Sequence, residues 1–545
     1  MFRLKSIYFY FLAIKIILNK FLKEFYFSTR FYNNSLKEKY PNDFHFYPNS
    51  YLLSSFINHK NFSFKISDIS IEDFWNQKNL DNLNNFYWLS LINRKHDSKT
   101  IQKIISLWIE KNKTYKRKIW NNSNVSKRII SWILNADIIL KNTNLYFKEN
   151  FFQSITLQVN HLKKNLHSEN SPTKKIEIIA AVLLSGLVFK EFNNNFNISI
   201  KELKKILNEF FDEDGFPISR SIYDLVQCSK FLVLIRECCK DAQEYIPDYL
   251  DAIVEKIVIC VNSLKTNADK NPLFNGACEF KINDYLNYLS GLDYNLKKTK
   301  KSIGQICVLK NKKTLIFFDH GEPPEKRFSN NYQSGPLSFE YYIDDKKIIT
   351  NCGYGNKISK KAELVSRLTS AQSTVTVNDT SVTKFERNKL INVAFGTSIK
   401  SSFKIKDYDY QEDNKSISVS AKHNAYQENF GLIHLRNINL QKENGNLYGQ
   451  DQLIFTKNSG STYNYSIRFH LYPGIIPVQT LGGSSILIPI ERNKSLIFIT
   501  NEENLKIEKS IFLGRNEILN NFCINISGQL KNEDKLLKWQ IKKNI

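Results

Sequence analysis

Histidine and tyrosine side chains in one short stretch of the C-terminal half can move protons. His423 and Tyr426 stand in the string His423-Asn424-Ala425-Tyr426, which we interpret as a loop ahead of a strand, where functional groups often lie. Imidazole and phenol groups serve as general acids and bases. We predict both as catalytic residues. The alternative is that they only satisfy the hydrogen bonds of a turn.

A second pair of polar side chains follows on the next predicted strand. His434 alternates with Ile433 and Leu435, so it points to the opposite face of the strand, and Arg436 shares its face. That face is either a binding cleft or solvent. We predict His434 and Arg436 as substrate-binding residues.

A tyrosine and an arginine stand close together in the N-terminal half. Tyr223 is a candidate general base or acid, although an aromatic side chain on an apolar helix is more often part of a core. Arg220 has a planar fork of donors that suits a carboxylate, and the alternative is a solvated or capping arginine. We predict a catalytic role for Tyr223 and a substrate-binding role for Arg220.

Neither the histidines nor the cysteines have the spacing of a metal site. His423, His434 and His470 are far apart in sequence, and His470, between Phe469 and Leu471, is predicted to be a satisfied histidine of a sheet. The eight cysteines show no zinc-like spacing and several lie in apolar runs, so we expect buried free thiols. We predict no metal and no cofactor.

Helices must position Tyr223 and Arg220, the candidates in the N-terminal half. From about residue 98 to 265, apolar residues recur every three to four positions in segments of similar length. Ser98, Ser126 and the pair Ser171-Pro172 mark helix starts. The predicted helices are 99–118, 125–141, 151–166, 174–192, 200–211, 221–239 and 247–264. Such helices pack as successive antiparallel hairpins, in an incomplete α/α toroid or, alternatively, in a plain bundle or solenoid.

Strands must position the remaining groups, because the period changes to two after about residue 300. Residues 337–343 and 346–351 form a predicted hairpin around Asp344-Asp345, and Asn444-Gly445 marks another turn. Further predicted strands are 373–377, 416–420, 432–440, 465–471 and 486–490. Many short strands with hardly a helical pattern among them predict a β-sandwich.

The fold class predicted from these periods is multidomain α+β, with an N-terminal incomplete α/α toroid followed by a C-terminal antiparallel β-sandwich. At 545 residues the chain is too long for one ordinary core. The Lys-rich stretch 296–301 marks the boundary. We predict three parts: a basic, amphipathic segment and lead-in (1–74), a helical domain (75–300) and a β domain (301–545).

Charge bears on the partners of the chain. The composition is globular, with 42% hydrophobic residues, and the net charge of +24 suits a polyanion, although a bias toward Lys, Asn and Ile throughout the sequence explains part of it. The basic start and the apolar run from Ile7 to Leu18 resemble a signal peptide poorly, because Lys15 interrupts the run and no small-residue cleavage site follows. We expect a basic amphipathic helix that packs on the protein or contacts a membrane surface.

Several strings, in order along the chain, resemble the heparinase II/III family of polysaccharide lyases. The resemblance covers roughly residues 75–540. In the helical half its strings are 128–133 and Asp214-Gly215-Phe216-Pro217-Ile218-Ser219-Arg220-Ser221; in the β half they are 319–324, 334–340, 351–353, Thr369-Ser370-Ala371-Gln372-Ser373-Thr374-Val375-Thr376-Val377, 423–426, 431–436 and 468–474.

The resemblance implies cleavage of a uronate-containing glycan by β-elimination, in a cleft between toroid and sandwich. Such a reaction needs a base for the proton on C5, neutralisation of the neighbouring carboxylate and an acid for the departing O4 oxygen. It implies an acidic polysaccharide as partner and a location in the cell envelope or periplasm. No nucleic-acid motif is recognisable, so we expect no nucleic acid as partner.

Two departures from the family pattern weaken the prediction of catalysis. Gln372 and Pro217 stand where the family carries histidines. A glutamine can still donate a hydrogen bond to a carboxylate, so we predict Gln372 as substrate-binding, but it cannot transfer a proton near neutral pH. The alternative function is therefore a glycan-binding or structural cell-envelope protein with impaired catalysis on the same scaffold.

Overall fold

The computed structural model describes residues 2–57, 73–76, 83–92, 98–457, 460–492 and 494–544. Residues 58–72, which belong to the predicted lead-in 1–74, lie outside this description. The chain divides into two compact units, each built from two stretches of sequence. Unit 1 comprises Met1–Phe211 and Val226–Ile257, and unit 2 comprises Asp212–Leu225 and Val258–Ile545. Within the described residues, none of the helices has the length and apolarity to cross a bilayer.

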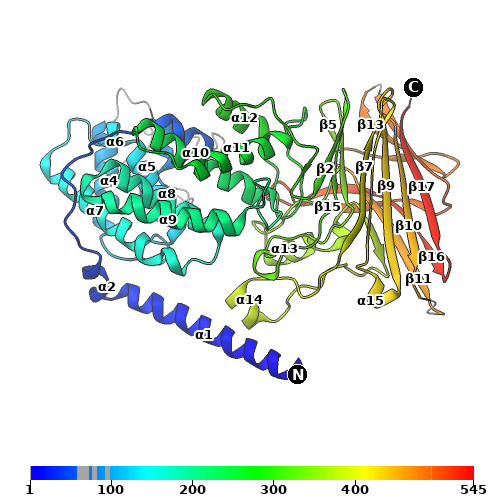
Figure 1. The fold of residues 1–545 in the computed structure, drawn as a ribbon, viewed down its shortest axis with the longest axis horizontal. Coiled ribbons are helices and arrows are strands. Elements are labelled where there is room, and N and C mark those ends of the chain that lie inside the picture. Colours follow the sequence, from blue (N-terminus) through cyan, green and yellow to red (C-terminus); the bar gives the residue numbers. More distant parts are fainter. Residues whose placement is uncertain are drawn as a thin grey trace. The chain divides into compact units, whose positions relative to one another are not determined.

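Unit 1 is helical (Figure 1). α8 packs against α9 and α5, and α7 packs against α4, α5 and α8. The helices that lie wholly within unit 1 are α1 (Phe2–Ser28), α2 (Arg30–Ser35), α4 (Ser98–Lys111), α5 (Asn122–Leu134), α6 (Ala136–Ile139), α7 (Leu145–Asn165), α8 (Pro172–Val188) and α9 (Asn193–Phe210). α10 (Ile222–Asp241) and α11 (Asp248–Ser263) each belong partly to unit 1 and partly to unit 2.

The helix starts show what the sequence predicted well and where it was wrong. α4 begins at Ser98 and α8 has Pro172 in its first turn, as predicted. The predicted start at Ser126 is wrong: Asn121 is the N-cap of α5, its side chain accepts a hydrogen bond from the Asn124 amide, and Ser126 is buried inside the helix. Both Asn and Ser favour this position, so the pattern alone did not separate them.

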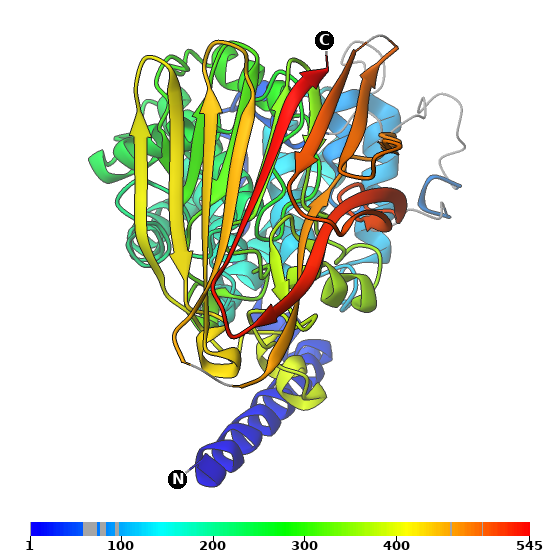
Figure 2. The same ribbon diagram turned by 90° about the vertical axis from the view of Figure 1, so that its right-hand side faces the viewer.

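Unit 2 consists mainly of antiparallel strands in three sheets. The first has the order β1-β2-β3-β4-β5, the second β12-β13-β14-β17-β10-β9-β8-β7, and the third β15-β16-β11-β6. Figure 2 shows the face of the second sheet, with β7, β8 and β9 in yellow and β17 in red. The strands are β1 (Ser302–Ile303), β2 (Ile306–Lys310), β3 (Thr314–Asp319), β4 (Phe339–Ile343), β5 (Lys346–Ile349), β6 (Val375–Val377), β7 (Ile405–Glu412), β8 (Ser416–His423), β9 (Leu432–Gln441), β10 (Leu447–Phe455), β11 (Thr462–His470), β12 (Val478–Gln479), β13 (Ser485–Glu491), β14 (Lys494–Thr500), β15 (Leu505–Phe512), β16 (Leu519–Lys531) and β17 (Lys535–Asn544).

The three sheets share one hydrophobic core. It includes Phe339 of β4, Ile438 of β9, Phe469 of β11 and Trp539 of β17. β8 and β9 alternate buried and partly buried residues along their length, the period of two expected for a sheet with one face in a core. The predicted hairpin turns at Asp344 and Gly445 are present with positive φ angles. Unit 2 also contains short helices that the period did not predict: α12 (Ile282–Gly291), α13 (Lys360–Ser366), α14 (Lys389–Phe395) and α15 (Gln427–Phe430).

A helical N-terminal region followed by antiparallel sheets confirms the predicted fold class. The predicted boundary at residue 300 falls just before β1, but the compact unit that contains the strands also includes residues 212–225 and 258–300. The eight cysteines are free thiols, and all except the half-buried Cys278 are buried.

Candidate functional site

Arg220 lies buried in unit 2, in a turn that leads into α10. Its backbone φ angle is 57°, and its amide donates to the carbonyl of Pro217 at 2.8 Å. The guanidinium forms an ion pair with the buried Asp319 at the end of β3 and donates to the carbonyls of Gly304 and Glu322, both at 3.2 Å. These bonds connect the turn to the first sheet. They direct the donors of Arg220 to protein groups, and its predicted role toward a substrate stays a prediction.

Tyr223 is the exposed member of the predicted catalytic set. It lies in the first turn of α10, and 41% of its surface is exposed. The neighbouring Asp224 is bonded to two serines: the Ser219 Oγ donates to its carboxylate at 2.7 Å, and its backbone amide donates to the Ser221 Oγ at 3.2 Å. These bonds fix the backbone at the start of the helix, which carries Tyr223.

Gln372 follows the short 3₁₀ helix η9 (Thr369–Ala371) and is buried. Its side-chain amide donates to the carbonyls of Ser366 at 2.8 Å and Leu368 at 3.4 Å. Gly335 packs against it so closely that an added Cβ would lie 3.0 Å from the Gln372 Cγ. The amide therefore holds the loop against α13, and its predicted contact with a carboxylate stays a prediction.

His423, His434 and Asp451 form one buried chain of hydrogen bonds. The His434 Nε2 lies 2.7 Å from the Asp451 Oδ1, and the His423 Nε2 lies 3.1 Å from the His434 Nδ1. The Ala425 amide donates to the His423 Nδ1 at 3.2 Å. Since this amide can only donate, Nδ1 of His423 accepts; its Nε2–H then donates to His434, whose Nε2–H donates to Asp451. Each ring nitrogen has a partner.

Arg436 completes this buried network at the same carboxylate, that of Asp451. Its Nε donates to the Asp451 Oδ1 at 2.7 Å, and its Nη1 donates to the carbonyls of Leu337 and Ser373 at 2.8 and 2.9 Å. The Trp539 indole donates to the Asp451 Oδ2 at 2.9 Å. All these side chains are buried. The network therefore carries one buried ion pair with full hydrogen bonding, the arrangement that burial of charge requires.

Burial sets the protonation states of this network. Burial lowers the pKa of His423, and the nearby His434 and Arg436 lower it further. Burial also lowers the pKa of His434, against the opposing effect of Asp451. Burial by itself raises the pKa of Asp451, but the Arg436 charge and the His434 hydrogen bond outweigh it, so this pKa lies below its ordinary value. Two neutral imidazoles and a carboxylate–guanidinium pair result.

Tyr426 lies beside the network and is equally inaccessible. Its ring centroid is 5.7 Å from that of His423, and its hydroxyl donates to the Val375 carbonyl at 2.9 Å. Burial raises the pKa of this phenol well above its ordinary value. The structure thus brings His423, Tyr426, His434 and Arg436 together in the core of unit 2. In the part of the chain that is described, no three His, Cys, Asp or Glu side chains converge as metal ligands.

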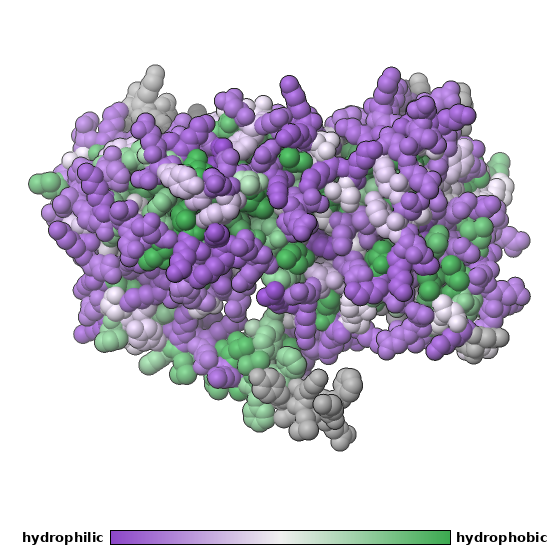
Figure 3. All heavy atoms as spheres, viewed as in Figure 1, coloured by the Kyte–Doolittle hydropathy of each residue, from purple (hydrophilic) through white to green (hydrophobic). Residues whose placement is uncertain are grey.

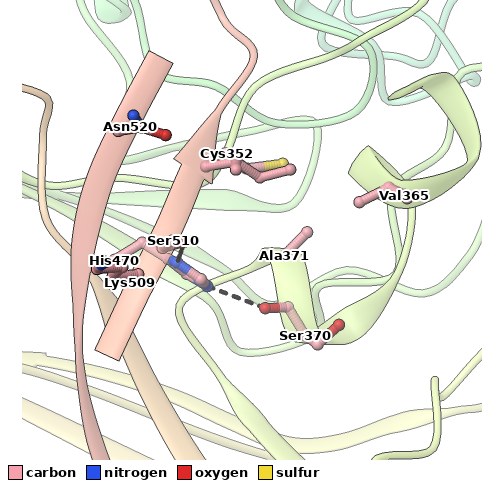
Figure 4. Close-up of a pocket in the computed structure, with 9 residues that line it drawn as sticks. Cys352, Val365, Ser370, Ala371, His470, Lys509, Ser510 and Asn520 are labelled. Atoms are coloured by element: carbon pink, nitrogen blue, oxygen red, sulfur yellow. Dashed lines mark hydrogen bonds between the residues drawn. The ribbon is translucent and has the colours of Figure 1, made fainter. Parts of the chain in front are cut away.

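A pocket of about 360 Å³ opens beside the loop that carries Gln372 (Figure 4). It combines polar groups, apolar groups and one cation. The residues that line it are Cys352, Val365, Ser370, Ala371, His470, Lys509, Ser510, Ile511 and Asn520. The Lys509 side chain is on β15, an edge strand of the third sheet. The volume is in the range of small-ligand pockets.

His470 connects two walls of this pocket. Its Nε2 lies 3.0 Å from the Ser370 carbonyl oxygen and its Nδ1 lies 2.9 Å from the Ser510 Oγ (Figure 4). A carbonyl only accepts, so Nε2 carries the proton and Nδ1 accepts from the Ser510 hydroxyl. Burial lowers the pKa of His470 to about 4. The neutral histidine has both nitrogens bonded, as the sequence predicted for a satisfied sheet residue, and it also fixes the serines at the pocket.

Two carboxylates hold these buried arginines, and neither was among the predicted site residues: Asp451 pairs with Arg436, and Asp319 pairs with Arg220. A signal for Asp451 existed: it shares the inward face of β10 with Gly449 and Leu453 and stands opposite Arg436 in the register of β9 and β10. A charged residue on an inward face needs a partner. Asp319 had no such signal, because its partner Arg220 is 99 residues away in sequence.

Comparison with known proteins gives a family match for the β region. Residues 300–540 match the family described as Heparinase II/III-like, C-terminal. No curated protein matches the sequence at a significant level.

Solved structures extend the likeness across both halves of the chain. The heparan sulfate lyase HepC from Pedobacter heparinus aligns with 89% of this chain and 80% of its own, at 15% identity and a TM-score of 0.62. Two structures of heparinase III each align with 88% of this chain and with 81% and 78% of their own, at 13% and 14% identity and TM-scores of 0.66 and 0.65. The TM-scores show that these proteins share the fold of this chain, and at identities this low the matches show the fold alone.

Proposed function

Since residues 300–540 form a heparinase II/III-like C-terminal domain on a chain with the heparinase III fold, we propose that this protein cleaves a uronate-containing acidic polysaccharide by β-elimination. The observation that carries the proposal is the combination of this domain match with a fold likeness over 88% of the chain. The structures that share the fold are named heparinase III and heparan sulfate lyase.

Tyr223 is the proposed proton-transfer group. Among the residues predicted to act on the glycan, it alone has a large exposed surface, while His423 and Tyr426 are buried with their polar atoms bonded to protein. When the C5 proton and the O4 oxygen lie on the same face of the sugar, one tyrosine can take the proton as the phenolate and, as the phenol that results, give it to the leaving oxygen. A tyrosine can therefore serve both steps without a histidine at 217 or 372.

The four residues predicted to bind substrate act in our proposal through the scaffold. The polar atoms of Arg220, Gln372, His434 and Arg436 bond to buried protein groups. Arg220 fixes the turn three residues before Tyr223, and Gln372 and Arg436 fix the loop beside the pocket. They would hold the surfaces that meet the glycan, rather than meet it themselves.

The pocket beside Lys509 supports an acidic sugar as ligand. An exposed ammonium group attracts a carboxylate or sulfate, and Ser510 and Asn520 add hydroxyl and amide groups that suit sugar hydroxyls. The net charge of +24 favours a polyanion further. We propose a location in the cell envelope or periplasm, because a polymeric substrate does not pass a membrane unaided.

A second candidate function is glycan binding without catalysis. The specific observations in its favour are Gln372 and Pro217, which cannot transfer protons, and the closed hydrogen-bond chain that leaves His423 no access to substrate. Under this proposal Tyr223 only contacts the sugar.

Tyr223→Phe separates the two functions. Purified protein is incubated with a panel of uronate-containing glycans while ultraviolet absorbance follows the unsaturated uronate that elimination creates. For a lyase, we expect Tyr223→Phe to lower kcat by at least roughly a hundred-fold with glycan binding retained. Tyr146→Phe, at a 69% exposed tyrosine of α7, is the matched control and should keep full activity.

Two results would decide against the lyase. Wild-type protein that binds on a glycan array but forms no unsaturated product supports the binding protein instead. A Tyr223→Phe variant as active as wild type would remove Tyr223 from the chemistry. Absence of both product and binding across the panel would contradict both candidate functions.

A further inference from the structure

α1 exposes a continuous stripe of large apolar side chains. Phe11, Ile14, Leu18, Phe21, Leu22 and Phe25 are between 42% and 70% exposed. Their spacing of three or four residues places them on one face of the helix. In Figure 3, hydrophobic side chains, in green, gather over α1 along the lower edge of the view. A water-soluble surface rarely carries so many large apolar groups together.

The C-terminal end of α1 packs on its own unit through the face opposite the stripe. Ala13 and Phe27 are buried. The Phe27 ring lies 5.1 Å from that of Tyr115 and 5.5 Å from that of His161. The Glu24 carboxylate accepts a hydrogen bond from the Tyr115 hydroxyl at 2.7 Å. These contacts hold the end of α1 from Glu24 to Phe27 on unit 1, with Phe21, Leu22 and Phe25 on its exposed side.

The charges of the first 39 residues bear on what covers the stripe, a second copy of the helix or an anionic surface. The first 39 residues contain eight basic and two acidic side chains. Lys15 is exposed next to the stripe, whereas Glu24, the single acidic residue of α1, faces the protein and is bonded there. A second copy of the helix would bring like charges together. An anionic surface attracts the same charges.

We propose that α1 lies in the plane of an anionic lipid bilayer, with its apolar stripe at the boundary between headgroups and acyl chains. Its 27 residues span about 40 Å along the surface. Phe31 of α2, 73% exposed, adds a further apolar anchor near the end of the helix. A helix with an exposed apolar stripe, basic residues and too little apolarity to cross the bilayer is the kind that binds in this way. This attachment is independent of the action on a glycan.

Flotation of the full-length protein with lipid vesicles tests the proposal. Vesicles of phosphatidylcholine with 30% phosphatidylglycerol are compared with vesicles of phosphatidylcholine alone. We expect wild-type protein to float with the anionic vesicles. The double variant Phe21→Asp/Phe25→Asp should weaken binding by at least roughly a hundred-fold, because it places charge in the apolar boundary. Lys15→Gln should weaken binding roughly five-fold, and only to the anionic vesicles.

A matched control uses the same substitutions at exposed apolar positions elsewhere. Leu145 and Tyr146, at the start of α7, are 78% and 69% exposed. Leu145→Asp/Tyr146→Asp adds the same charge and should float like wild type. Circular dichroism of each variant checks that it is folded.

Three outcomes would overturn the proposal. The first is wild-type protein that stays unbound with both vesicle types. The second is equal weakening by the α1 variant and by its control. The third is a dimer in light scattering that dissociates in Phe21→Asp/Phe25→Asp while vesicle binding is unchanged, since a second copy would then cover the stripe.

Discussion

Arg220 shows how burial decides what an arginine can do. From its sequence, the residue had the donors to hold a substrate carboxylate. In the fold, it occupies a left-handed backbone conformation that costs a non-glycine residue on the order of 1 kcal/mol, and its guanidinium is bonded to Asp319 and backbone carbonyls. Gly321 leaves the space, because a Cβ there would meet the guanidinium. The environment is built around this side chain.

Arg220→Ala is expected to destabilise the protein by about 3–5 kcal/mol, because it leaves the Asp319 carboxylate buried and unpaired. The change is measured as the loss in the free energy of unfolding by urea. Arg327→Ala removes an exposed ion pair with Glu325 and should cost less than about 1 kcal/mol. Equal losses in the two variants would contradict a structural role for Arg220.

His470 makes the stability of unit 2 depend on pH. Burial lowers its pKa from an ordinary value near 6.5 to about 4. Between these values the unfolded chain binds a proton that the folded protein does not. The stability from this residue is therefore complete above pH 6.5 and is lost as the pH falls toward 4.

His470→Gln should therefore destabilise the protein at pH 7 and destabilise it less at pH 4.5. The difference between the two pH values is on the order of 3 kcal/mol. Urea unfolding of both proteins across this range measures it. His167→Gln, at a 75% exposed side chain, is the control for loss of an imidazole and should change stability at pH 7 by less than about 0.5 kcal/mol. A constant gap between His470→Gln and wild type would contradict the assignment.

The close contact between β10 and β17 shows why a strand position can require glycine. Gly449 pairs with Trp539 in the register of these strands, and a Cβ on Gly449 would overlap the Trp539 ring. That ring stacks on Phe339, with centroids 5.5 Å apart, and its indole holds Asp451. Because Gly449 has no side chain, the Trp539 ring fits against β10, where it packs in the core and its indole donates to Asp451.

Gly449→Ala is expected to cost about 1–3 kcal/mol of unfolding free energy, since the indole must move in a packed core. Gly482→Ala lies in a turn with open space around it and should change stability by less than about 0.5 kcal/mol. Thermal and urea unfolding measure both. A neutral Gly449→Ala would mean that the contact between β10 and β17 relaxes without loss.

At the scale of the whole molecule, compact units do not follow the order of the chain. Residues 212–225 belong to unit 2 although unit 1 surrounds them in sequence. Arg220 holds this segment to the first sheet, and the buried Lys347 of β5 donates to the Asn271 carbonyl at 3.3 Å while it pairs with Glu340. A domain boundary at residue 300 would place Arg220 and the first sheet, and likewise Asn271 and Lys347, in different domains.

Hydrogen exchange in dilute denaturant tests this division. Amides of residues 212–220 should become exposed together with those of β3 and β4, because their bonds lie within unit 2. Amides of α5 and α8 should open in a separate step. Opening of 212–220 in one step with α5 and α8 would contradict the assignment to unit 2.

The sequence alone determined the fold class and the position of most elements. Period and turn chemistry are local, so a change from a period near four to a period of two identified the helical and β regions, and Asp344 and Gly445 marked turns that are present. Several short sequence strings, in the order of the family, were enough to suggest the family that the β region matches. The predicted roles in catalysis and substrate binding remain predictions.

Only the tertiary structure decided which of the seven predicted site residues meet solvent. His434 and Arg436 do share a face, as alternation predicted, but that face is the core, where Asp451 compensates the charge. Tyr223 was the candidate whose sequence most suggested a core residue, and it is exposed. Burial depends on partners far away in sequence, such as Asp319 for Arg220. The free energy of burying a polar group depends on those partners more than on the type of the residue.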